Sequence, residues 1–403
     1  MNKRIAIIGG GAAGLAAACA LGKGSDITIY ERNDRVGKKL LSTGNGRCNI
    51  VNTNLSPKQL HSKNNEMVSE ILGTSPVSEI MTFFENLGLL MRIEYEGRVY
   101  PLCNQASAVL DVLRYEACEK GVNFRYNFCV TDIKKTTDGF MLKSGNESAI
   151  ADIVILACGG MAAPKTGSDG IGYNLAKAFG HSINNPLPAL VALKSDTSFT
   201  APLKGIRCKV AVKLVAGKDV ITSESGEIQF ADYGISGIAA MQLSRHLAKG
   251  CRIIIDFAEL YNEDYILYRL KEAVKKYREA QDIMTGIVQK RVAQSILKHT
   301  LAIAPSTPAG KLSEQDLNKL TKAIKGLELD INGTLKWDNA QITSGGIPLS
   351  EITSSMESKL VKNLYITGEM LDCDGECGGY NLGWAWICAL RAANSINKEL
   401  SLC

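Results

Sequence analysis

A glycine-rich turn near the start of the chain constrains its fold more than any other feature. The turn has the pattern Gly-x-Gly-x-x-Gly at Gly9, Gly11 and Gly14. It follows the apolar run Arg4–Ile8, which is typical of a buried parallel strand, and it precedes an alanine-rich stretch at 12–21 that favours a helix. The sequence therefore opens with a strand, a tight turn and a helix.

A second strand with an acidic residue at its end completes this unit. Asp26–Tyr30 (DITIY) predicts the strand, and Glu31 follows it, 22 residues after Gly9. In such a unit one glycine permits the tight turn, one lets the backbone approach a pyrophosphate and one lets the helix pack on the strand. The helix N-terminus favours phosphate, and Glu31 can accept hydrogen bonds from ribose hydroxyls. The pattern therefore predicts a dinucleotide site.

A polar loop after the acidic residue favours FAD over NAD. Residues 34–49 read DRVGKKLLSTGNGRCN. Lys38 and Lys39 can balance phosphate charge, and the small, Gly-rich stretch 42–49 suits a loop that wraps the ribityl–pyrophosphate part of FAD. A dehydrogenase that only borrows NAD seldom needs a second loop at this place. The alternative is a surface turn with basic residues.

A second constellation lies near the other end of the sequence. Residues 363–397 predict a strand (NLYITG), a Gly-rich loop (DCDGECGGYNLG) and a helix (WAWICALRAANSI). In two-piece FAD folds a carboxylate in this loop accepts hydrogen bonds from the ribitol or pyrophosphate end, and Glu369 and Asp372 are the candidates. Backbone N–H groups at the helix start can face the flavin pyrimidine carbonyls.

The middle of the chain differs in character from both ends. From about residue 190, segments such as CKVAVKLVAG and EIQF alternate as in an antiparallel barrel or sandwich, whereas 261–326 are mostly helical. We therefore predict an α/β protein with three parts. These are a Rossmann-like two-piece FAD-binding domain (1–190 plus 343–403), an inserted β-barrel-like domain (191–258 plus 327–342) and a small helical domain (259–326).

Charge and composition argue against several classes of function. The 403 residues have a net charge of +5, no block of Lys and Arg, and only 6% aromatic residues, so we expect no nucleic-acid partner. Twelve scattered cysteines without a CxxC pair, and four dispersed histidines, predict no metal site and suit a reducing compartment. No run reaches the ~18 apolar residues of a transmembrane helix. We expect a cytoplasmic protein with no membrane partner.

The motifs together resemble the BaiN/YhiN-type family of bacterial NAD(P)/FAD-dependent oxidoreductases. The resemblance spans the chain and rests on GGGAAGLAAA, GKKLLSTGNGRCN, GRVYP, ILACGGMAAPKTGSDGIGYNLAKAFGH, TSGGIPLSEI and MESKLVKNLYITGEMLDCDGECGGYNLGWAW. It implies tightly bound FAD, an inserted barrel-like domain and a small helical domain. Relatives are associated with reduction of conjugated double bonds in 3-oxo bile acids and with oxidation of aminoacetone. Cys158 and Cys377 stand where relatives often carry Thr, and Cys103 where Ser is common, which can change hydrogen bonds around the flavin.

The motifs and the resemblance give one set of expected cofactor-binding residues. No second Gly-x-Gly-x-x-Gly precedes a helix, so NADH or NADPH is expected only as a transient electron donor. No spacing selects a catalytic acid or base from the candidates Arg47, Tyr233 and Glu376. The cofactor-binding set is Gly9, Gly11, Ala12, Ala13, Gly14, Glu31, Arg32, Lys39, Ser42, Thr43, Gly44, Arg47, Cys48, Asn49, Val130, Cys158, Gly159, Gly160, Gly346, Gly368, Glu369, Asp372, Gly379, Tyr380 and Asn381.

Cysteines near the expected flavin have an ordinary structural interpretation. Cys48 is the only cysteine between residues 20 and 102, so it lacks the nearby partner of a disulfide reductase and is expected to be a packed thiol. A disulfide between Cys373 and Cys377 is disfavoured in a Gly-rich loop of a cytosolic protein.

Three functions remain open at this point. The leading interpretation is hydride transfer through flavin N5 in the NAD(P)H-linked reduction of a conjugated C=C, such as an enone of the 3-oxo-Δ4 steroid or bile-acid type. One alternative is a FAD-dependent oxidase of a small amine such as aminoacetone that uses O2. Another, of a different class, is a flavin-binding nucleic-acid-modifying or regulatory protein, which predicts a basic face with exposed aromatic side chains. The expected partner is a small-molecule substrate, and the oligomeric state is open.

Overall fold

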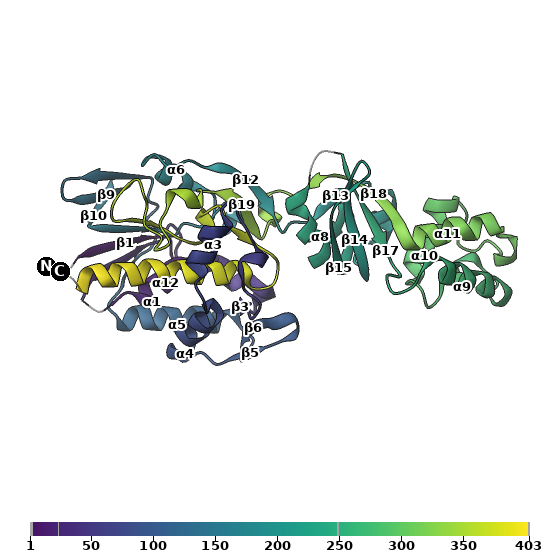
Figure 1. Ribbon diagram of the computed structural model, residues 1–403, viewed down its shortest axis with the longest axis horizontal. Helices are drawn as coiled ribbons and strands as arrows, with labels where there is room; N and C mark the ends of the chain where they lie inside the picture. Colours follow the sequence, from purple (N-terminus) through teal and green to yellow (C-terminus); the bar gives the residue numbers. More distant parts are fainter. Residues whose placement is uncertain (1–2, 23, 248–249, 402–403) are drawn as a thin grey trace. The chain divides into compact units, whose positions relative to one another are not determined.

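The computed structural model divides the chain into two compact units (Figure 1). It describes residues 3–22, 24–247 and 250–401. Unit 1 consists of Met1–Pro188 and Gln341–Cys403, and unit 2 of Ala189–Ala340. The first unit is therefore built from two separate stretches of sequence, between which the second is inserted.

A five-stranded parallel sheet forms the centre of unit 1. Its strand order is β20-β11-β1-β2-β7, which confirms the expected Rossmann-type arrangement. Every residue of β11 and β20 is buried, as expected for strands of a parallel sheet with both faces covered. The strands are β1 (Arg4–Ile8), β2 (Asp26–Tyr30), β7 (Asn123–Arg125), β11 (Ile153–Leu156) and β20 (Leu364–Ile366).

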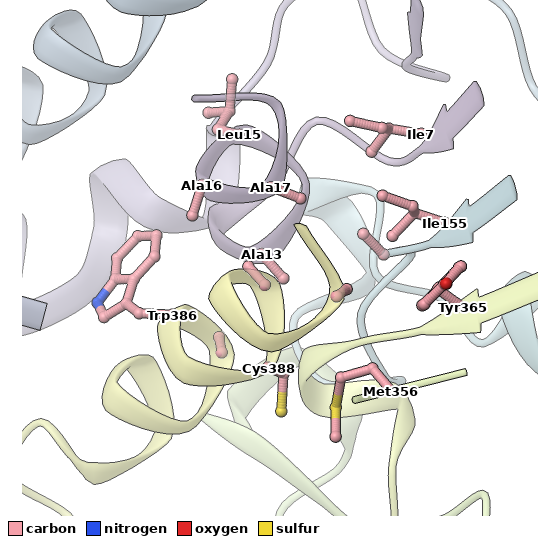
Figure 2. Packing of buried hydrophobic residues seen from close by; sticks show 14 of the residues in the cluster. Ile7, Ala13, Leu15, Ala16, Ala17, Ile155, Met356, Tyr365, Trp386 and Cys388 are labelled. Carbon is pink, nitrogen blue, oxygen red and sulfur yellow. The ribbon is translucent and has the colours of Figure 1, made fainter. Parts of the chain in front are cut away.

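The C-terminal stretch completes both the sheet and the core of unit 1. Strand β20 pairs with β11, and the 22-residue helix α12 (Tyr380–Ser401) packs on α1 (Ala12–Ala20). Figure 2 shows the small side chains of Ala13 and Ala16 on the side of α1 that faces α12. The indole Nε1 of Trp386 donates a 2.9 Å hydrogen bond to the carbonyl oxygen of Ile50, which ties α12 to the N-terminal stretch.

Smaller elements surround this sheet. Two short antiparallel sheets, β10-β9-β8 and β3-β6-β5, and two strand pairs, β12-β19 and β21-β4, belong to unit 1. The strands are β3 (Val51–Asn52), β4 (Leu60–His61), β5 (Met91–Ile93), β6 (Arg98–Pro101), β8 (Asp132–Thr136), β9 (Gly139–Ser144), β10 (Glu147–Ala151), β12 (Asn184–Ala189), β19 (Ile342–Gly346) and β21 (Asp374–Gly375). The helices are α2 (Lys38–Ser42), α3 (Asn65–Leu72), α4 (Pro76–Asn86), α5 (Ala106–Glu119) and α6 (Ile171–Lys177).

Unit 2 contains a closed six-stranded barrel, as the alternating pattern predicted. Its strand order is β13-β16-β15-β14-β17-β18, and the inward side chains of β14 include Val210, Val212 and Leu214. The strands are β13 (Leu193–Ser195), β14 (Arg207–Ala216), β15 (Asp219–Ala231), β16 (Gly234–Ser236), β17 (Cys251–Asp256) and β18 (Leu327–Thr334).

The helical segment after β17 shares a hydrophobic core with the barrel. Ile266 and Leu270 of one helix and Leu320 of another belong to the same buried cluster as Ile253 and Ile255 of β17. The helices of unit 2 are α7 (Thr197–Thr200), α8 (Ile238–Leu243), α9 (Glu263–Lys276), α10 (Lys290–Leu301) and α11 (Glu314–Gly326). Within the described ranges, no helix is both long and apolar enough to span a bilayer.

Candidate functional site

The expected cofactor-binding residues follow directly after four neighbouring parallel strands. Gly9 follows β1, Glu31 follows β2, residues 157–160 follow β11 and residues 367–369 follow β20. The carboxyl ends of parallel strands meet at one edge of a sheet, and the strand order changes direction on either side of β1. In open α/β sheets, ligands bind at such a switch point. The fold thus brings motifs from both ends of the sequence to the same edge.

Contacts at this edge are so close that only glycines fit. A Cβ on Gly9 would lie 2.6 Å from the carbonyl oxygen of Ala157, and Gly9 has a φ of +106°. A Cβ on Gly14 would lie 2.0 Å from the carbonyl oxygen of Gly9, so this glycine lets α1 pack on the turn. A Cβ on Gly160 would lie 2.3 Å from Thr343 Oγ1. These glycines hold the strand ends together through packing.

Gly11 differs from the other glycines of the turn because space surrounds it. A Cβ at this position would meet no heavy atom of the described residues within 4 Å, and the φ of −84° is ordinary for any residue. Gly11 is the N-cap of α1, and the space that a side chain at this position would occupy is empty. Unpaired N–H groups and the positive end of the helix dipole favour an anion there. The turn therefore has the shape and the polarity that a pyrophosphate requires.

Glu31 is buried at the end of β2 and orders the glycine turn. Its Oε2 accepts a 2.9 Å hydrogen bond from the N–H of Gly10, and its Oε1 accepts from the N–H and the side-chain amide of Asn33. The N–H of Phe128 donates to the Glu31 carbonyl oxygen, and Val130, two residues after Phe128, is buried. The carboxylate is therefore fixed in position, as a group that recognises ribose hydroxyls must be.

An ion pair joins the two halves of unit 1 at the same edge. Lys39 Nζ lies 2.7 Å from Glu369 Oε2, and the other carboxylate oxygen accepts a 3.0 Å hydrogen bond from the N–H of Thr343. Thr343 Oγ1 in turn accepts from the N–H groups of Met161 and Ala162. Sequence reasoning missed Thr343 as a site residue, although its segment TSGG contributed to the family resemblance.

The loop at 43–49 has an unusual backbone that its glycines permit. Gly44, Asn45 and Gly46 follow one another at φ values of +56°, +56° and +83°, and Cys48 has a φ of +59°. The N–H groups of Arg47 and Cys48 donate back to the carbonyl oxygens of Gly44 and Thr43, which closes the loop into a tight turn. Burial raises the pKa of the Cys48 thiol to about 12. This thiol is therefore protonated at neutral pH, which fits the expected packing role.

Asn49 lies between this loop and the C-terminal loop. A Cβ on Gly379 would lie 2.7 Å from Asn49 Oδ1, so the two segments are in contact. Asn381 folds the C-terminal loop, because its side chain accepts from the N–H of Gly375 and donates to the carbonyl oxygens of Gly375 and Glu376. Asp372 accepts a hydrogen bond from the side-chain amide of Asn184.

Arg47 is held by protein groups. One of its guanidinium nitrogens lies 2.6 Å from both carboxylate oxygens of Glu94, and its Nε donates to Asn104. The guanidinium also stacks over the Tyr100 ring at 3.9 Å. The hydrogen bond from Arg47 holds the pKa of Glu94 below its ordinary value. These contacts support a role for Arg47 in shaping the loop.

The remaining expected residues fall into three groups. Arg32 forms an ion pair with Asp169. Tyr233 lies in unit 2, between β15 and β16, and its carbonyl oxygen accepts from the N–H of Ser195. The others lie in unit 1, in the helices α1, α2 and α12, in strand β19, or in the turns and loops; these are Ala12, Ala13, Ser42, Thr43, Cys158, Gly159, Gly346, Gly368, Glu376 and Tyr380. Burial raises the pKa of Cys158 to about 12.

Comparisons with known proteins agree with this arrangement. The family model of the HI0933-like protein Rossmann domain matches residues 3–395. A 3-dehydro-bile acid delta(4,6)-reductase of Clostridium scindens is 36% identical over 97% of this chain and 98% of its own length. A ribosomal RNA dihydrouridine synthase of Haemophilus influenzae is 27% identical over 98% of each chain.

A solved structure shares the fold at low sequence identity. It is 3-ketosteroid-delta4-(5alpha)-dehydrogenase from Rhodococcus jostii in complex with 4-androstene-3,17-dione, with a TM-score of 0.51, 15% identity, and coverage of 98% of this chain and 97% of that one. The family model matches almost the whole chain, so it is stronger evidence for the family than this structural similarity. The chain thus belongs to the HI0933-like Rossmann family, the BaiN/YhiN type of flavin-dependent oxidoreductases.

Proposed function

We propose that this chain binds FAD at the carboxyl edge of the unit 1 sheet and reduces a carbon–carbon double bond conjugated with a carbonyl group. NADH or NADPH is the proposed electron donor. The observation that most strongly supports this proposal is the 36% identity, over 97% of the chain, with a relative named as a 3-dehydro-bile acid delta(4,6)-reductase. A second relative is named as a ribosomal RNA dihydrouridine synthase. The double bond of uracil is also conjugated with a carbonyl, so both names describe one type of reduction.

Each part of FAD can be matched to residues at the edge of the unit 1 sheet. The open N-terminus of α1 at Gly11 suits the pyrophosphate, and the fixed carboxylate of Glu31 suits the adenosine ribose. Lys39 and Glu369 lie where the two halves of the unit meet and suit the pyrophosphate and ribitol. The loop at 43–49 and the start of α12 suit the flavin end. When bound, FAD supplies the hydride transfer itself, and the protein positions it and excludes water.

The proposed substrate is a small apolar enone of the 3-oxo-Δ4 steroid or bile-acid type. In such a reduction the β-carbon accepts a hydride and the α-carbon accepts a proton from an acid within hydrogen-bond reach. The three candidates for this acid are Arg47, Tyr233 and Glu376, and the Arg47 guanidinium is held by Glu94 and stacks on Tyr100.

An anaerobic experiment tests the proposal directly. The purified yellow protein is mixed with NADH and then NADPH while the visible flavin band is followed. We expect rapid bleaching by one of them, and reoxidation when a 3-oxo-4-ene steroid is added. Bleaching by aminoacetone alone, with hydrogen peroxide released in air, would instead establish the amine oxidase and refute the reductase.

A specific observation favours a second candidate substrate, a uridine in RNA. Within 189–340 there are 22 Lys and Arg residues and 17 Asp and Glu residues, whereas the rest of the chain has 24 of each. All the net positive charge of the chain therefore lies in unit 2, and this charge would attract a polyanion such as RNA to that unit. The matching experiment measures dihydrouridine in ribosomal RNA from a strain that lacks the gene. Loss of one modified position, restored by the gene, would select RNA over the steroid.

A further inference from the structure

A buried tyrosine in unit 1 has a hydroxyl group to which the fold gives no partner. Tyr173 on α6 is only 5% exposed, and its hydroxyl makes no hydrogen bond to any of the described residues. Buried polar groups in folded proteins almost always have a hydrogen-bond partner, because leaving one without a partner costs free energy. The hydroxyl of Tyr173 therefore requires a partner from outside the chain. Sequence reasoning did not select this residue.

A glycine brings Tyr173 to the carboxyl edge of the unit 1 sheet. A Cβ on Gly172 would lie 2.7 Å from Cys158 Cβ and 2.8 Å from Met370 Cε. Cys158 comes shortly after β11 and Met370 shortly after β20, so α6 packs closely against the segments that leave both strands. Tyr173 thus belongs to the edge at which the expected cofactor-binding residues meet.

Two carboxylates near the hydroxyl are bound to other groups. Burial raises the pKa of Tyr173, and the negative charges of Glu369 and Asp372 raise it further, so the hydroxyl keeps its proton and can donate it. Glu369 forms an ion pair with Lys39. Asp372 accepts a hydrogen bond from the side-chain amide of Asn184. Neither carboxylate accepts from Tyr173, which leaves the hydroxyl available as a donor to a ligand.

We propose that the Tyr173 hydroxyl donates a hydrogen bond to the ribitol chain of bound FAD, an inference that rests on the FAD site proposed above. Phosphate groups suit the surroundings of this hydroxyl poorly, because the carboxylates of Glu369 and Asp372 repel them. The ribitol chain is uncharged, and its hydroxyl groups can both accept from the tyrosine and donate to a carboxylate. Tyr173 is therefore a cofactor-binding residue, and its hydroxyl serves the ligand and not the fold.

The variant Tyr173→Phe tests this role, because it removes the hydroxyl and keeps the ring. Titration of the apoprotein with FAD, followed by quenching of flavin fluorescence, should give a Kd about three- to tenfold higher than that of the wild type, as for the loss of one neutral hydrogen bond. The Kd for ADP, which has the adenosine and both phosphates but no ribitol, should stay unchanged in calorimetric titration. The midpoint of urea unfolding of the apoprotein should not fall, because the hydroxyl bonds to none of the described residues.

Tyr365→Phe is the matched control in the same unit. Tyr365 is buried on β20, and its hydroxyl lies 3.4 Å from Ser395 Oγ in a hydrogen bond, so this variant should lower the urea midpoint and leave the FAD Kd unchanged. A wild-type apoprotein that binds no FAD would refute the proposed function and this inference with it. If the wild type binds FAD and Tyr173→Phe binds it equally tightly, the FAD site stands and the role of Tyr173 is overturned. An equal loss of ADP affinity, or a lower urea midpoint in Tyr173→Phe, would overturn it too.

Discussion

Replacing Gly11 with alanine separates cofactor binding from folding. A Cβ at Gly11 meets no heavy atom of the described residues within 4 Å, and its φ of −84° suits alanine. The apoprotein should therefore lose at most about 1 kcal/mol, the usual cost of an alanine at an N-cap. In the holoprotein the same methyl group enters the space proposed for the pyrophosphate. Losing one charge-assisted hydrogen bond costs about 1.5–3 kcal/mol, which corresponds to a roughly 10- to 150-fold weaker FAD Kd.

Gly14→Ala is the matched comparison on the same turn. Its Cβ would lie 2.0 Å from the carbonyl oxygen of Gly9, so α1 must move by about 1.4 Å to reach an ordinary contact of 3.4 Å. Overpacking of this kind costs about 1–3 kcal/mol or more. Gly14→Ala should therefore destabilise the apoprotein itself, whereas Gly11→Ala should not.

Two measurements check this pair of expectations. Urea unfolding of the apoproteins, followed by circular dichroism, gives their free energies of unfolding. Quenching of flavin fluorescence during titration gives the FAD Kd. A Gly11→Ala protein that binds FAD as tightly as the wild type would refute the placement of the pyrophosphate. A larger loss of apoprotein stability in Gly11→Ala than in Gly14→Ala would refute the steric argument.

Three further outcomes are expected. Gly10→Ala should destabilise the apoprotein by about 1–3 kcal/mol, because its Cβ would lie 2.2 Å from Val36 Cγ1, and Val36→Ala should relieve this loss in a double-mutant cycle measured in urea. Glu31→Ala should weaken FAD binding by about 1–3 kcal/mol in calorimetric titration, and an unchanged Kd would contradict the ribose assignment. The hydrogen bond from Arg4 holds the pKa of Asp152 below its ordinary value, so this pair stabilises the fold above the unfolded-state pKa and loses its effect as the pH falls through the lowered pKa. Asp152→Asn should therefore cost up to about 1 kcal/mol at neutral pH and almost nothing in acid, as urea unfolding at both pH values would show.

The glycine turn and the acidic strand end could be predicted because each depends on local sequence, and the two-piece sheet could be predicted because motifs at both ends of the chain resemble one family. Gly9, Gly14 and Glu31 have fixed spacings within one β-α-β unit, and the short apolar runs at 153–156 and 364–366 resemble buried strands. The alternating pattern likewise indicated a barrel, which the structure confirms as a closed one.

Other features depend on contacts between distant residues. Thr343 connects residues 161–162 to Glu369, and no local pattern marks a threonine for that role. The helices of unit 2 have an amphipathic pattern that predicts buried faces, but not that those faces pack on the barrel. The pairing of such faces depends on the whole fold.

The division of unit 1 into two stretches has a consequence for synthesis on the ribosome. Strand β20 and helix α12 complete the sheet and the core of unit 1. They are synthesised only after all of unit 2, which separates them from the first stretch of unit 1 (Met1–Pro188). At about 5–20 residues per second, roughly 10–40 s separate the end of the first stretch from the start of α12. During that time the apolar faces of α1 and β11 lack their final neighbours, whereas unit 2 is already continuous. Proteolysis of stalled chains that end before β20 should leave unit 2 resistant and the first stretch sensitive. We therefore expect unit 2 to fold before unit 1 is complete, and the FAD site proposed for unit 1 to form only once α12 is available.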